Sequence, residues 1–498
     1  MVASRSTLSR SAVVGHLVAL LGSSAVVTDK RQLQEVSVDR FKKYASVHGI
    51  YDGPQPAALV RPTSTEQVAA LLRFAQDYRV NVVPRTGGTG TEGGLETAVE
   101  DTVVIDGSAM NAILDVDPVN MRVTAQCGVP LQVLEDLLRE QGLTTGHSPQ
   151  SKPLAQMGGL VATRSIGQFS TLYGGIEDMV IGLEAVFPGG QVARIKNVPR
   201  RAAGPDIRHV VIGNEGALCY ITEVTVAVFR HYPDNNRYFG YLMDDFAAAI
   251  DSLRELVTAG YRPSVCRAYS AGDAGQHFSH FADGKCVVAL VAEGPAPIVA
   301  ATGQAIEEQF AAMPDVTPVD PGLIQEWFEG LNWGADKIEA EKQTMLQEKH
   351  LGYTTEVSVD WSQAGPLYDA VLDRIAAEFP HATDLSLLGG HSSHSYQTGT
   401  NLYFVYDYDI RCEPREEIEE YHKPLNAIIV EEALRFGGSM VHHHGIGKYR
   451  VPWVQQEHGS AYFLLEGLKK QFDPLCIMNA ATIYPVDEFT DPVPRSQA

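Results

Sequence analysis

Residues 84–94 read Pro84-Arg85-Thr86-Gly87-Gly88-Thr89-Gly90-Thr91-Glu92-Gly93-Gly94, a glycine-rich stretch that indicates a ligand-binding loop. It follows a β-branched run at residues 80–83 that predicts a strand, and five of its eleven residues are glycine. Glycine has no Cβ and readily adopts positive φ, so successive backbone N–H groups can curl around a phosphate. The stretch is not the P-loop signature GxxxxGK[ST]. It predicts an anion-binding loop, and a plain surface loop is the alternative.

Two further glycine-containing blocks follow along the chain. One comprises TTGHSP (residues 144–149) and QMGGLVATRS (156–165), and the other is VVIGNEGALCYITE (210–223). Each lies beside a run of β-branched or small residues. Together with the first stretch they could wrap around one long phosphate-bearing ligand, although any single glycine could simply permit tight packing.

The composition narrows the class of protein. With 498 residues the chain exceeds the roughly 250–300 residues at which one core usually divides, so we expect two lobes. Its net charge of −22 argues against nucleic acid or an anionic membrane surface as a partner. The six cysteines form no CxxC pair and therefore predict neither a zinc motif nor a redox motif. A reduced, cytoplasmic protein is the expectation.

The N-terminal segment has two interpretations. Arg5, Arg10 and the apolar run at residues 12–27 imitate a signal peptide. His16 and Gly22 interrupt that run, however, and its leucines fit one face of an amphipathic helix, which we predict instead. No uninterrupted apolar stretch reaches the roughly 18 residues of a membrane span.

Helix and strand patterns alternate in the first half of the chain. Thr63-x-x-Glu66 is a capping box that predicts the start of a helix. After residues 229–236 the pattern changes, and helical runs at 246–256, 298–310 and 366–379 interleave with strands at 285–292 and 401–408. Pro366 is expected at the first position of its helix. These patterns predict an α+β fold of two small subdomains followed by a sheet covered by helices.

Several of these motifs together resemble one known family. The segments PRTGGTG, GHSP, MGGLVATRSIG, YGGIEDMV and GPDIRHVVIGNEGALCYITEVTV are similar to the FAD-binding domain of the vanillyl-alcohol-oxidase/PCMH superfamily. Near the C-terminus, HHHGIGKYR and LKKQFDPLCIMNAATIYP resemble its D-lactate-dehydrogenase-like branch. Within that branch, HHHG at residues 442–445 and GPDIRH are most similar to alkyldihydroxyacetonephosphate synthases and their bacterial FAD-linked oxidoreductase relatives.

The resemblance implies a division of the chain into four parts. An N-terminal helical segment (1–55) precedes a PCMH-type FAD-binding domain of two subdomains (56–232). An α/β substrate cap domain (233–440) follows, and the C-terminal segment (441–498) returns its helices to the flavin and completes the active site.

The resemblance also implies FAD, with the first loop around the pyrophosphate and the other two along the rest of the cofactor. Relatives that link flavin covalently often carry a histidine after a Gly-Gly pair in this loop. Thr89 stands there and has no nucleophilic nitrogen, so we expect non-covalent FAD. The residues expected to bind it are Pro84, Arg85, Thr86, Gly87, Gly88, Thr89, Gly90, Gln150, Ser151, Gln156, Gly159, Thr163, Arg164, Ser165, Glu215, Gly216 and Ile221.

The catalytic residues implied by the resemblance come from the cap and the C-terminal segment. Tyr403 corresponds to the acid/base tyrosine of the synthases, with packing in the core as the alternative interpretation. A phenol has an ordinary pKa near ~10, so it needs neighbours, which His442, His443 and His444 could provide. Arg267 corresponds to an active-site arginine that could bind a carboxylate or phosphate, with a surface salt bridge as the alternative.

A metal site is the open question around the histidines. In the D-lactate-dehydrogenase-like branch, a GHxGDGNxH-like segment and a glutamate before HG bind a divalent ion. Here the segment is residues 394–403, and His443 stands in place of the glutamate. Five histidines at 391, 394 and 442–444 could still gather around zinc, but without a carboxylate we predict a hydrogen-bonded acid/base cluster and no metal.

Two reactions fit the resemblance. The first is FAD-dependent oxidation of a CH–OH group in a small hydroxy acid or polyol-type substrate, by hydride transfer to flavin N5. The second is the flavin-dependent alkyl transfer of the synthases, without net redox change. The sequence leaves open whether oxygen, a quinone or an electron-transfer flavoprotein accepts the electrons. Relatives of this kind also imply a homodimer.

Overall fold

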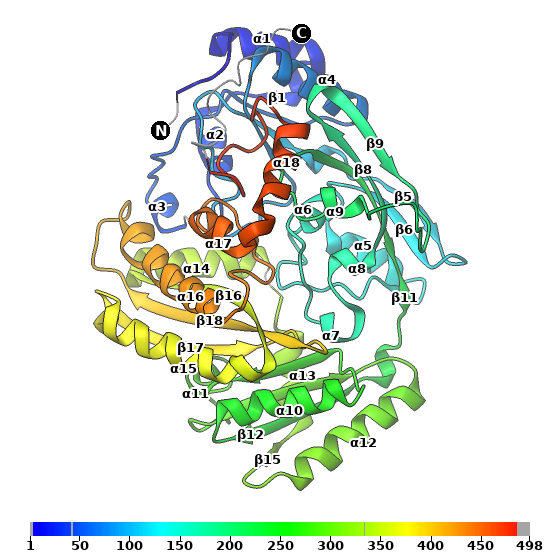
Figure 1. Cartoon of the computed structure of the whole chain (residues 1–498), viewed down its shortest axis with the longest axis vertical. Helices are drawn as coiled ribbons and strands as arrows, with labels where there is room; N and C mark the ends of the chain where they lie inside the picture. The colour runs from blue at the N-terminus through cyan, green and yellow to red at the C-terminus, as the bar shows by residue number, and fades with distance from the viewer. Residues whose placement is uncertain (1–2, 41–42, 333, 486–498) are drawn as a thin grey trace.

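The computed structural model describes residues 3–40, 43–332 and 334–485, which form two lobes stacked along the long axis of the molecule (Figure 1). The first half of the chain builds the upper lobe in that view, and most of the second half builds the lower lobe. The last helices, α17 (Val454–His458) and α18 (Tyr462–Phe472), return to the upper lobe. This arrangement confirms the predicted α+β fold with a cap and a returning C-terminal segment.

The first subdomain of the upper lobe is a four-stranded sheet. Its strand order is β1 (Val26–Val27), β2 (Ala58–Val60), β4 (Val103–Asp106) and β3 (Val82–Arg85), with β2, β4 and β3 parallel. Around it lie α1 (Arg10–Leu21), α2 (Lys30–Val36) and α4 (Thr65–Tyr78). The short helix α3 (Lys43–Val47) contacts α14 (Ala335–Glu348) of the second lobe, and its Tyr44 is buried in the core of that lobe. Val13 and Leu17 of α1 are buried in one core with Leu72 of α4. The predicted N-terminal helix is therefore part of the core.

The second subdomain is a five-stranded antiparallel sheet. Its strand order is β5 (Ile113–Asp117), β6 (Arg122–Gln126), β10 (Tyr220–Ala227), β8 (Val180–Phe187) and β9 (Gln191–Ile195). A short pair of strands, β7 (Leu143–Thr144) and β11 (Phe229–Arg230), leads toward the cap. The helices are α5 (Leu131–Arg139), α6 (Met157–Ala162), α7 (Ser170–Tyr173), α8 (Ile176–Met179) and α9 (Arg208–Val211).

The cap is built on a seven-stranded antiparallel sheet. Its strand order is β15 (Thr317–Val319), β12 (Arg237–Met243), β14 (Cys286–Ala292), β13 (Val265–Tyr269), β17 (Leu385–Ser392), β18 (Gly399–Asp409) and β16 (His350–Asp360). One apolar core joins this sheet to α10 (Phe246–Thr258), α12 (Ala296–Ala312), α15 (Trp361–Glu378) and α16 (Lys423–Arg435). The other cap helices are α11 (Ala271–His277), α13 (Pro321–Glu329) and α14 (Ala335–Glu348).

The cap sheet has a core side and a cavity side, as the strand β18 illustrates. Successive side chains of a strand point to opposite faces of the sheet. The even-numbered residues 402–408 belong to the apolar core, whereas residues 403, 405 and 407 line a cavity between the lobes. The alternation of side chains along β18 therefore points every second residue toward the cavity and the upper lobe.

Two of the predicted helix starts are wrong. The N-cap of α4 is Ser64, whose side chain accepts the N–H of Gln67, while the neighbouring Thr63 hydroxyl bonds the Gln67 side chain. Helix α15 starts directly after β16, with Asp360 as its N-cap, so Pro366 lies inside the helix. At α4 a second residue with good capping chemistry stands next to the predicted one, whereas α15 simply begins at Trp361, ahead of the predicted start at Pro366.

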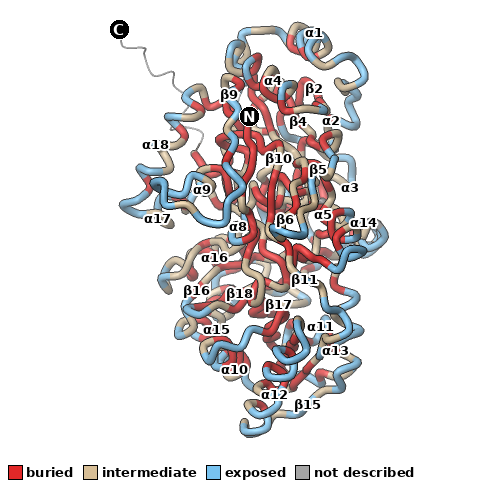
Figure 2. The backbone as a smooth tube through the Cα atoms, turned by 90° about the vertical axis from the view of Figure 1, so that its right-hand side faces the viewer, coloured by how far each residue is buried: buried red, intermediate tan, exposed pale blue. Residues whose placement is uncertain are grey.

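Burial follows this layered arrangement. Figure 2 shows the strands of both lobes largely buried, whereas the outer helix α12 is largely exposed. Among the described helices, none has both the length and the apolar character that crossing a bilayer requires.

Candidate active site

A cavity of about 590 Å³ lies between the two lobes. The upper lobe contributes all three glycine-containing blocks to its lining. The cap contributes residues from β13, β16, β17 and β18, and the C-terminal segment contributes residues 443, 444 and 447. The predicted cofactor loops and the predicted catalytic residues therefore face the same space.

All but three of the residues predicted to bind FAD line this cavity. The residues that do so are Pro84, Thr86, Gly88, Thr89, Gly90, Gln150, Ser151, Gln156, Gly159, Thr163, Ser165, Glu215, Gly216 and Ile221.

Arg85, Gly87 and Arg164 do not line it. Gly87 packs on backbone, where a Cβ would lie 2.8 Å from the backbone nitrogen of Gln156. The Arg164 side chain is 52% exposed and pairs with Glu177 at 3.4 Å. Arg85 is buried next to the loop backbone, where burial lowers its pKa despite nearby carboxylates. These three residues support the loops from behind.

Two glycines explain why the loops need this composition. Gly88 has φ of +69°, and a Cβ there would lie 2.4 Å from the guanidinium of Arg85. At Gly159, in α6, a Cβ would lie 2.4 Å from the backbone oxygen of Thr86. Larger residues would therefore force the loop after β3 away from its support or away from α6.

The C-terminal segment fixes two of the glycine blocks. Val82 of β3 donates its N–H to the carbonyl of Ile477 at 2.8 Å, and Asn479 donates its N–H to the carbonyl of Val82 at 2.8 Å. The side-chain amide of Asn479 also donates to the carbonyls of Gly94 and Glu215, at 2.9 and 2.8 Å. The last described residues thus connect the first glycine block to the third.

The lining fits a phosphate-bearing cofactor. Thr86, Thr89 and Ser165 bring hydroxyl groups to the cavity wall beside the glycine backbone. The amide oxygen of Gln156 is buried and has no hydrogen-bond partner among the described residues. Backbone amides and hydroxyls of this kind bind phosphate without a full counter-charge. FAD would therefore be held by these loops.

Four polar side chains lie in one row across the cap sheet. Tyr269 of β13 is paired with His391 of β17, His391 with Tyr403 of β18, and Tyr403 with Glu356 of β16. The rings of His391 and Tyr403 stack with centroids 4.7 Å apart. Residues in cross-strand register share a face of the sheet. The strand register therefore places one acid/base group beside the next.

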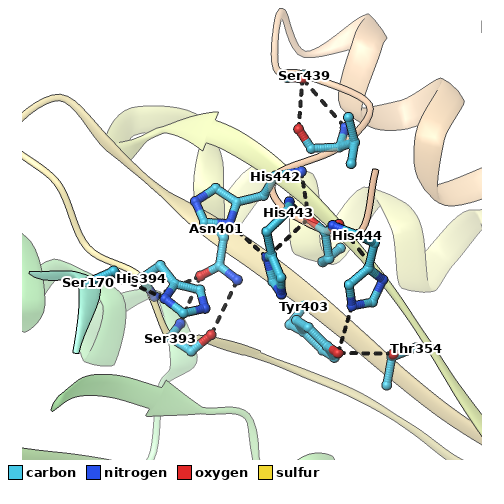
Figure 3. A network of polar contacts seen from close by, with 12 residues as sticks. Ser170, Thr354, Ser393, His394, Asn401, Tyr403, Ser439, His442, His443 and His444 are labelled. Carbon is cyan, nitrogen blue, oxygen red and sulfur yellow. Dashed lines mark hydrogen bonds and ion pairs between the residues drawn. The ribbon is translucent and has the colours of Figure 1, made fainter. Parts of the chain in front are cut away.

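Tyr403 heads a chain of hydrogen bonds (Figure 3). Its hydroxyl lies 3.0 Å from Nε2 of His444 and accepts a hydrogen bond from Thr354 at 3.1 Å. The other ring nitrogen of His444, Nδ1, lies 3.3 Å from a carboxylate oxygen of Glu92. Burial raises the pKa of Tyr403 well above its ordinary value, so the phenol is protonated and donates to His444. The partner of Tyr403 is His444 rather than the other two histidines of the motif.

Glu92 is charged even though it is buried. Burial would raise its pKa, but the Arg450 guanidinium and His444 outweigh this effect and lower the pKa to about 2. Arg450 is itself fully buried and contacts Glu92 at 3.1 and 3.2 Å. A carboxylate in this state can stabilise a proton on His444.

A second buried carboxylate holds the histidine motif in place. Glu356 accepts the backbone N–H groups of His442, His443 and His444 at 2.6, 3.2 and 2.7 Å. Arg450 donates to the backbone carbonyl of Glu356 at 2.9 Å. Three converging N–H groups satisfy the buried charge and fix the direction in which each imidazole points.

The five histidines divide into three groups. His444 bonds Tyr403, and His391 bonds the buried carboxylate of Asp273 at 2.6 Å. The remaining three, at positions 394, 442 and 443, place one ring nitrogen each within 4.8 Å of the other two. His442 does not line the cavity, unlike His443 and His444. The predicted cluster therefore exists, but its members have different partners.

Arg267 of β13 is buried and faces the cavity. It donates to the hydroxyl of Tyr269 at 2.7 Å, and its guanidinium lies 5.6 Å from the centre of the Trp327 ring. No carboxylate of the described residues forms an ion pair with it within 4.0 Å. A buried guanidinium without a counter-ion is suited to bind an anionic group. The alternative of a surface salt bridge does not fit this position.

Sequence reasoning missed four charged residues of this site, namely Glu92, Asp273, Glu356 and Arg450. Each is buried, and each contacts a partner distant in sequence. Glu356 had a signal that could have found it, because it is the only charged residue in the otherwise apolar and hydroxyl-bearing run Tyr353–Val359. Glu92 belongs to the glycine stretch itself.

Two family models together match most of the chain. Residues 56–196 match the FAD binding domain, and residues 232–483 match the C-terminal domain of FAD linked oxidases. The FAD-linked oxidoreductase YgcU of Escherichia coli (strain K12) is 61% identical over 483 residues, which cover 97% of this chain and all of that protein. The chain belongs to the FAD-linked oxidoreductases.

The more distant relatives include proteins named as synthases and proteins named as oxidases. The alkyldihydroxyacetonephosphate synthase of Dictyostelium discoideum is 26% identical and aligns with 86% of this chain and 73% of its own. The glycolate oxidase subunit GlcD of Bacillus subtilis (strain 168) is 26% identical and aligns with 87% of this chain and 90% of its own.

Solved structures give the same fold. An alkyldihydroxyacetonephosphate synthase structure superposes with a TM-score of 0.77 at 23% identity, covering 96% of this chain and 89% of that one. p-Cresol methylhydroxylase superposes with a TM-score of 0.74 at 16% identity, covering 96% and 97%. The predicted PCMH-type architecture is confirmed.

Proposed function

We propose that this protein uses non-covalently bound FAD to oxidise a CH–OH group of a small hydroxy acid or polyol-type substrate. The observation that carries the proposal is the single cavity in which the glycine loops face Arg267, Tyr403 and His444. Such an arrangement supports a substrate held between a flavin and an acid/base chain. The oxidase relatives among the matched proteins support the same class of reaction.

Bound FAD would supply the hydride acceptor. Arg267 would hold an anionic group of the substrate through its unpaired guanidinium. The substrate hydroxyl would pass its proton to the Tyr403 oxygen as Tyr403 passes its own proton to Nε2 of His444. Glu92, charged by its contact with Arg450, would then stabilise the protonated imidazole. The Tyr403 hydroxyl lies 3.0 Å from Nε2 of His444, and Nδ1 of His444 lies 3.3 Å from a carboxylate oxygen of Glu92, so the proton route is already formed.

The alternative is flavin-dependent alkyl transfer, as the names of the synthase relatives suggest. The triple-histidine motif and Tyr403 favour it. Polar residues contributed by the cap weigh against it, because Gln276, His277, Lys337, Glu341 and Asp407 are among the residues that line the cavity. Such a lining suits a polar substrate better than a long alkyl chain.

The two proposed reactions can be distinguished by mixing the flavin-loaded protein anaerobically with a panel of hydroxy acids, sugar acids and glycerol derivatives. We expect one compound to bleach the visible absorption of the flavin and to be recovered as its carbonyl product. If no compound bleaches the flavin, and an acylated dihydroxyacetone phosphate instead exchanges its acyl chain for an alcohol, the transferase is correct and the oxidation is excluded.

Non-covalent attachment makes a separate prediction. Thr89 lines the cavity. According to the resemblance, it stands at the position where relatives that bind flavin covalently often carry the attaching histidine. Precipitating the protein with acid should therefore release all of the yellow colour into the supernatant as FAD. Colour retained in the washed pellet would contradict the prediction, and a covalent flavoprotein treated in parallel serves as the control.

A further inference from the structure

We propose that the active site takes a polyhydroxy acid that carries a second hydroxyl group between its anionic group and the carbon that is oxidised. His391 of β17 recognises this second hydroxyl, and the buried carboxylate of Asp273 holds His391 in position. The proposal rests on the proposed function and adds one recognised group to its substrate. It distinguishes this substrate from acids whose oxidised carbon is bonded directly to the carboxylate.

The ring of His391 is held in one orientation. Its Nδ1 atom lies 2.6 Å from a carboxylate oxygen of Asp273, a residue with no exposed surface. The ring stacks on Tyr403 with centroids 4.7 Å apart, and its centroid lies 4.9 Å from that of Tyr269. A side chain fixed by such contacts presents its remaining polar atom in a constant direction.

Asp273 and His391 belong to one rigid unit. Asp273 lies in the first turn of α11, and the N-cap of that helix is Ser270. Ser270 donates its N–H to the carbonyl of Gly390 at 2.9 Å, and its hydroxyl accepts the N–H of Gly390 at 3.0 Å. Gly390 belongs to β17 and directly precedes His391. The carboxylate and the imidazole are therefore in place before a substrate binds.

The other ring nitrogen of His391, Nε2, is an acceptor without a donor. An ionised carboxylate only accepts hydrogen bonds, so the ring proton is on Nδ1 and faces Asp273. Burial lowers the pKa of His391, and the carboxylate of Asp273 offsets this effect only in part, so the ring is neutral at neutral pH. His391 lines the cavity, and none of the described residues bonds its Nε2 atom. This lone pair is suited to accept a hydrogen bond from a hydroxyl group.

The hydroxyl that is oxidised does not fill this role. In the proposed reaction it contacts the oxygen of Tyr403, which is bonded to His444. Tyr403 is the cross-strand partner of His391, and neighbouring strands lie about 4.8 Å apart. Hydroxyl groups on adjacent carbons of one molecule can therefore reach both side chains. A substrate with only one hydroxyl would leave a buried acceptor unpaired, which weakens binding.

The order of the strands gives the order of the groups along the substrate. Arg267 is on β13, His391 on β17 and Tyr403 on β18, and these strands are consecutive in the sheet. The Nε atom of Arg267 is buried and has no hydrogen-bond partner among the described residues, so it is available to an anion. His391 therefore lies between the group that binds the anion and the group that accepts the proton.

The test compares matched acids on the flavin-loaded protein under anaerobic conditions. Glycerate carries both hydroxyls, lactate lacks the one farther from the carboxylate, and 3-hydroxypropanoate lacks the nearer one. Gluconate and 2-deoxygluconate give the same comparison in a longer acid. A shift of the flavin absorption reports binding, and bleaching of that absorption reports oxidation separately. We expect glycerate or gluconate to bind roughly 10–100-fold more tightly than its analogues that lack a hydroxyl.

The variant His391→Phe keeps an aromatic ring beside Tyr403 and removes the acceptor nitrogen. It should lose the discrimination between gluconate and 2-deoxygluconate, and Asp273→Asn should reduce that discrimination. His280→Gln is the control, because His280 is exposed and does not line the cavity, and it should keep the discrimination. The flavin absorption of each variant shows that it is folded, and Asp273→Asn replaces His391→Phe if the latter loses its flavin.

The two proposals fail in different ways. The inference is overturned if no polyhydroxy acid binds, if the analogues bind as tightly as the parent acids, or if folded His391→Phe keeps the full discrimination. Bleaching by lactate as rapid as bleaching by glycerate supports the oxidation and also overturns the inference. Discrimination in binding without any bleaching leaves the recognition of the second hydroxyl intact and contradicts the proposed oxidation instead.

Discussion

Replacing Tyr403 by phenylalanine should slow flavin reduction by the substrate by roughly 10²–10⁴-fold, the usual contribution of a positioned acid/base group. The change removes one hydroxyl and keeps the ring that stacks on His391. Folding and FAD content should therefore change little. The hydroxyl is the first member of the chain through His444 to Glu92, so its loss breaks the route of the proton. Stopped-flow measurement of flavin reduction gives the rate directly.

A matched control lies on the same strand. Tyr406 of β18 is on the core side of the sheet, where its hydroxyl bonds Thr355 and His422. Tyr406→Phe should leave the rate of flavin reduction within a fewfold of the unmodified protein, even if it lowers stability. If Tyr403→Phe also retains the full rate, the proton acceptor is elsewhere. His391, which lies next to Tyr403 in the row and bonds Asp273, is then the first candidate for the proton acceptor.

Replacing Gly88 by valine should abolish flavin loading. The backbone there has φ of +69°, which a β-branched residue rarely adopts, and the new Cβ would meet the guanidinium of Arg85 at 2.4 Å. The loop must then move, and its amides can no longer approach the phosphates. The ratio of flavin absorption to protein absorption in the purified variant measures the loss.

Gly90→Ala is the control in the same loop. A Cβ at Gly90 meets no described atom closer than 3.9 Å, and its φ is not positive. This variant should keep most of its flavin. Retention of full flavin loading by Gly88→Val would show that the loop is not the phosphate cradle, and that the residues around Gln150 and Glu215 hold the cofactor alone.

The sequence predicted the parts of the site that depend on local backbone demands. A glycine at Gly88 is required by φ and by close packing, and both requirements are visible in the local sequence as glycine density. Tyr403 was predicted from the resemblance, with packing in the core as the alternative. The alternation of β18 puts it on the cavity side of the sheet, together with residues 405 and 407.

The charge network could not be predicted in this way. Glu92 and Arg450 are separated by 358 positions, and the sequence around either residue does not indicate that the two side chains are in contact. The same reason explains why the motif of three histidines could not be resolved into separate roles. His444 and His443 differ in their contacts with Tyr403, Glu92 and Glu356, which come from other elements. The start of α4 was missed by one residue, because Ser64 rather than the adjacent Thr63 is its N-cap. The start of α15 was missed because the helix begins at Trp361, directly after β16, and includes Pro366 in its interior.

The hydrogen bonds of Asn479 have a consequence for biosynthesis. The glycine stretch at residues 84–94 leaves the ribosome early, but Asn479, one of its supports, follows Gly94 by 385 residues. A nascent chain can form the strands of both subdomains while translation continues. It lacks the hydrogen bonds that connect Gly94 and Glu215 through the Asn479 side chain until Asn479 emerges. Complete formation of the cofactor cradle therefore waits until Asn479 has left the ribosome, and the completed cradle can hold FAD only from that point.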